Sequence, residues 1–131
     1  MTVALARRAA WLAAAGLCLV YVYSGIDELL DFRGAVAVQA HFGLAMPAVC
    51  AAAAIAVQLG GSILVLFGRG RAVALGAVAL AGFTLAATFI GHPFWREAGA
   101  ERFADLNSFL EHFGLVGGFM LIALRAVPAS A

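Results

Sequence analysis

Long apolar stretches alternate along the chain with short polar clusters. Four such stretches cover residues 9–30, 47–68, 72–91 and 106–125. As helices, each is long enough to cross roughly 30 Å of hydrocarbon. Because a backbone in lipid must satisfy its own hydrogen bonds, stretches of this length predict helices rather than the shorter strands of a barrel. The pattern predicts a single domain, residues 1–131, with four membrane-spanning helices.

The connections between the stretches predict how the helices are arranged. The second and third stretches are joined only by the Gly-Arg-Gly-Arg sequence at 68–71, which requires a tight antiparallel hairpin. The longer connection after the first stretch has room for a short element at the membrane surface, at 34–42. No A-x-A-like cleavage site follows the first apolar run, so we expect it to be retained as a span. The fold class expected is an all-α antiparallel four-helix bundle in the membrane.

The composition supports lipid as the solvent of this chain. Hydrophobic residues make up 65% of it and charged residues only 11%, and the mean hydropathy is +1.03. The lipid bilayer is therefore its first expected partner. Nucleic acid is excluded as a partner class, because the chain has no lysine and no basic patch interleaved with aromatic residues. Cys18 and Cys50 form no C-x-x-C pair, which disfavours a dithiol redox motif and covalent haem; buried, inert thiols are expected.

The charged residues are divided between the two ends of the predicted spans. One end has five arginines and no acid, namely Arg7, Arg8, Arg69, Arg71 and Arg125. The other end has three arginines, all three histidines and all seven acids: Arg33, Arg96, Arg102, His41, His92, His112, Asp27, Glu28, Asp31, Glu97, Glu101, Asp105 and Glu111. The arginine excess predicts that the first end and both termini are cytoplasmic. The reactive side chains are then expected at the outer face.

Several polar residues recur at helical spacing and should share faces. The sets are Tyr21, Ser24 and Glu28; Gln58, Gly61 and Ser62; Thr84, Thr88 and His92; and Asn107, Glu111, Gly114 and Gly118. Small residues allow helices to approach closely, so we expect the last set, with Glu111, to point into the bundle. His41 is expected in an irregular, mobile connection.

Glu28, Glu111 and His112 are the candidates for proton handling. If the first and fourth spans pack together, these side chains would form an outward-facing pocket for a proton, a metal ion or a small polar headgroup. Because Glu111 lies only one or two turns inside its span, the alternative is a hydrated position at the interface with no chemical role. Asp27, next to Glu28, is a further candidate for ligand binding.

The segment His92-Pro93-Phe94-Trp95 follows the third span. Proline disfavours helical geometry at the residue before it, so this segment predicts a helix stop, and its aromatic rings suit an interfacial belt. The other interpretation is a wall for an aromatic headgroup, with His92, Phe94 and Trp95 binding the ligand. No histidine pair has H-x-x-x-H spacing, which disfavours haem or metal, and no metal ligands are predicted.

Short motifs follow one another along the chain, namely Ser24-Gly25-Ile26-Asp27-Glu28-Leu29, Gly60-Gly61, Gly68 to Arg71, His92 to Trp95, Phe109-Leu110 and Gly117-Gly118. This ordered set resembles that of the DoxX family over nearly the whole chain. The resemblance implies a small four-span protein in the cytoplasmic membrane of a prokaryote. Some relatives are linked with respiratory chemistry, as in the small subunit of thiosulfate:quinone oxidoreductase. Another is associated with a superoxide dismutase and a sulfurtransferase in an oxidative-stress complex.

The chain departs from the pattern of that family in two motifs. Relatives commonly have lysine in the first motif, where this chain has Glu28. They commonly have Lys-Asn after Phe-Leu in the fourth span, where this chain has Glu111-His112. Acidic side chains thus replace cationic ones, which argues against carrying over an anion-binding role and favours cations or protons.

These observations lead to the hypothesis of a subunit or accessory protein of a membrane redox system, with quinone as the candidate cofactor. Its partners would be other membrane or peripheral redox proteins, or further copies of itself. The alternatives are a structural subunit of a larger complex with no chemistry of its own, and a small proton or solute transporter. Whether the protein is an enzyme stays open at this point.

Overall fold

Four long helices and two short ones make up the part of the chain that the computed structural model describes, residues 2–127. Their bounds are α1 (Val3–Leu30), α2 (Phe32–His41), α3 (Pro47–Phe67), α4 (Arg71–Gly91), the 3-10 helix η1 (Phe94–Arg96) and α5 (Gly99–Ala126). Within this range there is no strand. The helices α1, α3, α4 and α5 are long and apolar enough to cross a membrane. The predicted all-α membrane bundle is confirmed.

The first and last long helices extend beyond the apolar stretches that predicted them. Both α1 and α5 have 28 residues. The side chain of Thr2 caps α1 by accepting a hydrogen bond from the amide of Leu5. At α5, residues 99–105 continue the helix with a polar sequence outside the span. Hydrophobicity marks where a helix enters lipid, and in α1 the Thr2 cap sets where the helix begins.

The short connections have the expected form. Gly70 precedes α4 with φ of 52°, a conformation that glycine adopts without steric cost, so the predicted hairpin between α3 and α4 can close. The surface element expected at 34–42 is α2, and Asp31 caps it by accepting a hydrogen bond from the amide of Gly34. His41 lies in the last turn of α2, with its ring against Phe42, rather than in an irregular connection.

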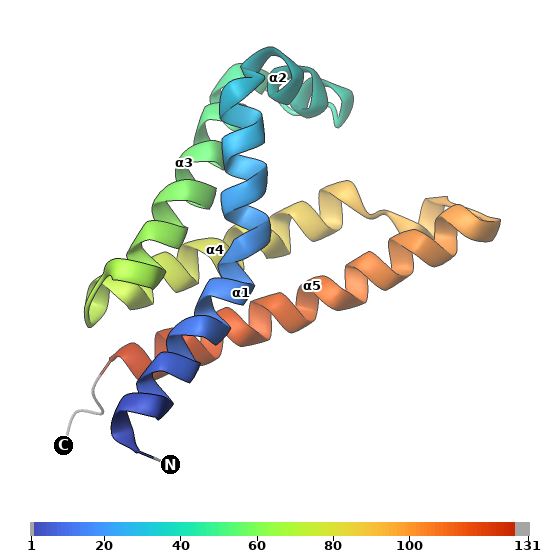
Figure 1. Ribbon diagram of the computed structural model, residues 1–131. Coiled ribbons are helices and arrows are strands. Elements are labelled where there is room, and N and C mark those ends of the chain that lie inside the picture. Colours follow the sequence, from blue (N-terminus) through green and yellow to red (C-terminus); the bar gives the residue numbers. More distant parts are fainter. Residues whose placement is uncertain (1, 128–131) are drawn as a thin grey trace.

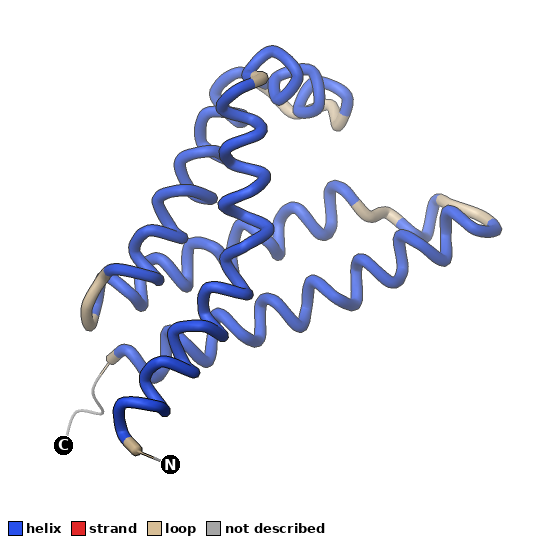
Figure 2. Tube along the Cα trace, viewed as in Figure 1, coloured by secondary structure: helices blue, strands red, loops and turns tan. Residues whose placement is uncertain are grey.

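The long helices pack as two antiparallel pairs. Helix α1 lies along α3 and α5 lies along α4, and the pairs meet where α3 packs on α4 (Figure 1). We call the end that carries α2 and η1 the α2 end, and the end with the start of α1 and the finish of α5 the terminal end. The two pairs diverge toward the α2 end, as the tube in Figure 2 also shows.

The hydrophobic core lies away from the α2 end, in the region where the two helix pairs are closest to each other. Its buried members are Cys18, Tyr21, Val65, Ala77, Leu80, Ala81, Phe119 and Ala123. Gly61 and Gly76 face each other across α3 and α4, and a Cβ on Gly76 would lie 2.7 Å from the carbonyl oxygen of Gly61. Close contact between the pairs here, and divergence beyond, leaves space at the α2 end for a site.

Candidate functional site

A cavity of about 640 Å³ lies between the two helix pairs toward the α2 end. Its wall is mostly apolar and comes from α3 and α4, with Phe42 and Leu44 from the α2–α3 connection. The four strongly polar side chains of the lining are Glu28, Gln39, His92 and His112. Helices α1, α2 and α5 contribute one each, and His92 caps the end of α4. The site is a largely apolar cavity with a few side chains that can form hydrogen bonds.

Glu28 is held at the cavity by a side chain of α3. The Nε2 of Gln58 donates a hydrogen bond of 2.9 Å to Oε2 of Glu28. Gln58 is only 2% exposed, so it has little freedom to find another partner. Gly25 lies one turn before Glu28, and a Cβ there would be 2.8 Å from the side chain of Leu59. The missing side chain at Gly25 therefore lets α1 approach α3 closely enough for this hydrogen bond.

A second set of hydrogen-bonded side chains connects α1, α4 and α5. The hydroxyl of Thr88 donates to the carbonyl of Thr84 at 2.6 Å, and its oxygen lies 2.9 Å from Nδ1 of His112. The hydroxyl of Thr84 donates to the carbonyl of Leu80, and its oxygen is hydrogen-bonded to the hydroxyl of Tyr21. Each threonine hydroxyl has one proton and donates it to a backbone carbonyl. Tyr21 and His112 are therefore assigned as the donors in their hydrogen bonds to the two threonines. In the neutral ring, Nε2 of His112 is then left as an acceptor.

We therefore predict that Nδ1 of His112 carries a proton. Nitrogen chemical shifts of histidine-labelled protein distinguish protonated from unprotonated ring nitrogens. The substitution Thr88→Val removes the acceptor and should shift the Nδ1 signal, whereas Thr88→Ser keeps the hydroxyl and should leave it near the wild-type position. An unprotonated Nδ1 in the wild-type protein would contradict this network.

The two histidines of the cavity are neighbours. The ring of His92 lies edge-on to the ring of His112, with 4.9 Å between centroids. Nδ1 of His92 is 3.2 Å from a carboxylate oxygen of Asp105 on α5, and both side chains are 27% exposed. Asp105 thereby orients His92. Polar groups thus continue from the partly exposed Asp105 through the two rings to Thr88.

A smaller cavity of about 130 Å³ adjoins the first one deeper in the bundle. The two cavities share Phe83, Ala87 and His112 as lining residues. Five of the nine residues around the smaller cavity have polar side chains, namely Tyr21, Ser24, Gln58, Thr84 and His112. A space of this size and polarity suits a few water molecules or the polar head of a ligand.

The structure places the three proton-handling candidates in different surroundings. Glu28 and His112 line the same cavity. Glu111 is exposed and lies outside that lining, so the expectation that it points into the bundle is wrong. Helix α5 instead turns His112, Phe119 and the half-buried residues between them toward its neighbours. The packing of Phe119 on Tyr21 sets this face and leaves Asn107, Glu111 and Gly114 exposed. Gly118, the last member of the predicted set, is half-buried and lies against Leu17 of α1.

The ligand-binding candidates are also divided. His92 lines the cavity. Phe94 and Trp95 pack on each other and on the ring of Phe109, outside the cavity lining, which suits an aromatic belt rather than a pocket wall. Asp27 is exposed and borders a hollow of about 320 Å³ under α2, which shares Glu28 and Gln39 with the larger cavity.

Several residues of the site were not among the candidates from the sequence. They are Gln39, Gln58, Thr88 and Asp105. Gln58 and Thr88 did show a signal, since each is polar and stands at helical spacing to other polar or small residues within a span. Gln39 and Asp105 had none, because they lie outside the apolar stretches. Within residues 2–127, no three His, Cys, Asp or Glu side chains are arranged to hold a metal ion.

Comparison with known proteins places the chain in a family. The DoxX family model matches residues 9–93. The inner membrane protein YphA of Escherichia coli (strain K12) is 26% identical over 111 residues, which cover 85% of this chain and 78% of that protein. No solved structure matches the chain. The matched region includes most of α1 and all of α2 to α4, with Glu28, Gln58, Thr88 and His92. The chain is a multi-pass membrane protein that belongs to the DoxX family.

Proposed function

We propose that this protein binds an amphiphilic molecule of the quinone class between its two helix pairs. The observation that supports this most is the cavity of about 640 Å³, which is apolar over most of its wall and has polar side chains from four elements. Ligand sites in membrane bundles combine such an apolar surface with a few placed polar groups. An isoprenoid or alkyl tail would contact the alanine-rich wall, and the head would reach the histidines.

The polar groups match the hydrogen bonding of a quinone head. Quinone carbonyls accept hydrogen bonds, which the amide of Gln39 can donate, as can Nε2 of His92 or His112 once that ring carries a second proton. Quinol hydroxyls donate hydrogen bonds, which Glu28 and the Nε2 of His112 can accept. Oxidation of a quinol releases two protons and two electrons. Glu28 and His112 would take up the protons, and a partner redox protein would take the electrons.

The proposed role is a subunit or accessory protein of a redox system in the cytoplasmic membrane. The relative from Escherichia coli is named as an inner membrane protein, which supports this membrane for the chain. The terminal end carries five arginines and no acid within residues 2–127, which supports cytoplasmic termini. The α5 face with Glu111, Gly114 and Gly117 is exposed, and small residues favour contact with another helix. That face is where we expect a partner protein to dock.

Binding of a quinone probe tests the proposal. Purified protein in lipid nanodiscs is titrated with a short-chain quinone that carries a photoreactive tail. We expect saturable labelling of cavity-lining segments of α3 and α4. The substitution His112→Phe keeps an aromatic ring but removes a hydrogen bond to the ligand, which is worth about 0.5–1.5 kcal/mol, so affinity should fall roughly two- to tenfold.

The neighbouring position supplies the matched control. Glu111→Gln changes a polar residue that is exposed and outside the cavity, so it should retain wild-type affinity. Equal losses in the two variants, or labelling of the wild-type protein that does not saturate, would overturn the proposal.

A further inference from the structure

A second cavity, of about 850 Å³, lies at the terminal end, on the side of the molecule away from the quinone-class site. Three segments far apart in the sequence form it: the first half of α1, the turn between α3 and α4, and the last turns of α5. Each contributes one arginine, namely Arg7, Arg69 and Arg125. The fold thereby places three arginines from separate segments around one hollow.

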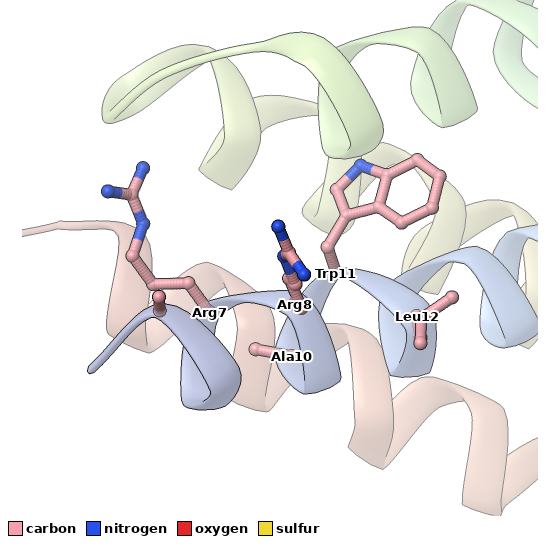
Figure 3. Close-up of a pocket in the computed structure, with 6 residues that line it drawn as sticks. Arg7, Arg8, Ala10, Trp11 and Leu12 are labelled. Atoms are coloured by element: carbon pink, nitrogen blue, oxygen red, sulfur yellow. The ribbon is translucent and has the colours of Figure 1, made fainter. Parts of the chain in front are cut away.

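The charge around this hollow is of one sign. Arg8 and Arg71 lie at the same end of the molecule. Arg8 follows Arg7 in the chain, and Arg71 is two residues after Arg69. Figure 3 draws a neighbouring hollow that shares Arg7, Ala10 and Trp11 with this one, and it shows the side chains of Arg7 and Arg8 on the same side of α1 as the indole of Trp11. Within residues 2–127, every acidic residue lies toward the α2 end, and no carboxylate there forms an ion pair with these arginines. The hollow therefore favours an anion.

The rest of the lining is apolar. The hollow therefore suits an anion that also has an apolar part better than it suits a simple inorganic anion. Leu17, Val65 and Leu121 are among the side chains that continue from the arginines into the span. The Nε1 of Trp11 donates a hydrogen bond of 3.1 Å to the carbonyl of Leu66, which fixes the indole as one wall of the hollow. Phosphate oxygens match the fork geometry of guanidinium groups, and acyl chains match the apolar surface beneath.

We infer that the terminal end binds an anionic phospholipid, with its phosphate held among Arg7, Arg69 and Arg125 and its acyl chains against α1, α3 and α5. Basic pockets between membrane helices are known to bind such headgroups. A bound lipid would bridge α1 and α5, which otherwise contact each other little. This site is independent of the cavity at the α2 end and of any quinone chemistry there.

Lipid binding by charge-matched variants tests the inference. Native mass spectrometry measures retention of phosphatidylglycerol or cardiolipin, against phosphatidylcholine, on purified protein. The triple variant Arg7→Gln, Arg69→Gln, Arg125→Gln should bind the anionic lipids about tenfold or more weakly. The control triple variant Arg33→Gln, Arg96→Gln, Arg102→Gln removes the same charge from exposed positions at the α2 end and should bind as wild type.

The wild-type protein alone keeps the inference testable where a variant fails to fold. It should retain anionic lipid in preference to phosphatidylcholine, and millimolar inorganic phosphate should not displace that lipid. Equal retention of phosphatidylcholine by the wild-type protein would overturn the inference. So would equal losses in the two triple variants, or displacement by inorganic phosphate, which would identify a site for the free ion.

Discussion

Replacing Gly76 by alanine is expected to lower the free energy of unfolding by about 1–3 kcal/mol, the usual cost of forcing extra atoms into a packed interface. A Cβ at this position would lie 2.7 Å from the backbone carbonyl oxygen of Gly61 and 2.7 Å from Cβ of Leu64. A backbone carbonyl cannot rotate away as a flexible side chain can. The substitution therefore has to separate α3 from α4, where the two helix pairs meet.

Gly82 on the same helix is the matched control. It is exposed, and a Cβ there would have no neighbour within 4 Å. Gly82→Ala should be neutral or stabilising by up to about 1 kcal/mol, because alanine favours the helix over glycine. Reversible unfolding of both variants in detergent micelles measures the difference. Equal stability of the two variants would show that the Gly61–Gly76 contact does not hold the pairs together.

Filling the cavity at the α2 end is expected to have the largest effect on ligand binding. Ala87 is half-buried and lines both the larger and the smaller cavity. In Ala87→Phe the new ring would occupy the space where the two cavities adjoin, where we place the quinone head. We expect the affinity for the quinone probe to fall roughly ten- to hundredfold, because the ligand or the ring must be displaced at an overpacking cost of about 1–3 kcal/mol.

The same change on a lipid-facing position controls for bulk and hydrophobicity. Ala56 on α3 is exposed and lines neither cavity, so Ala56→Phe should bind the probe as wild type does. Titration of the photoreactive quinone into both variants, with the unfolding midpoint as a check of integrity, separates the outcomes. Undiminished binding to Ala87→Phe would place the ligand elsewhere and remove the cavity from the proposed function.

The sequence predicts the faces of the helices with different success. The polar face of Tyr21, Ser24 and Glu28 is visible at helical spacing, and the structure places it against α3 and α4. The face of α5 was predicted wrongly for Asn107, Glu111 and Gly114, which are exposed, whereas Gly118 of the same set does pack against α1. Side-chain volume decided otherwise: Phe119 fills the core beside Tyr21, and that rotates Glu111 outward.

The sequence by itself determined the number of spans, their antiparallel order and the separation of arginines from acids. These properties depend on the length of each apolar stretch and on the residues of each turn, which can be read from local segments of the sequence. Only the tertiary structure decided which polar residues meet, because such meetings depend on helix rotation and on the angle between the pairs. Glu28 meets Gln58 and His112 meets Thr88 through contacts between separate helices. The cavity lies where the pairs diverge, beyond the close packing of Gly61 and Gly76 between α3 and α4.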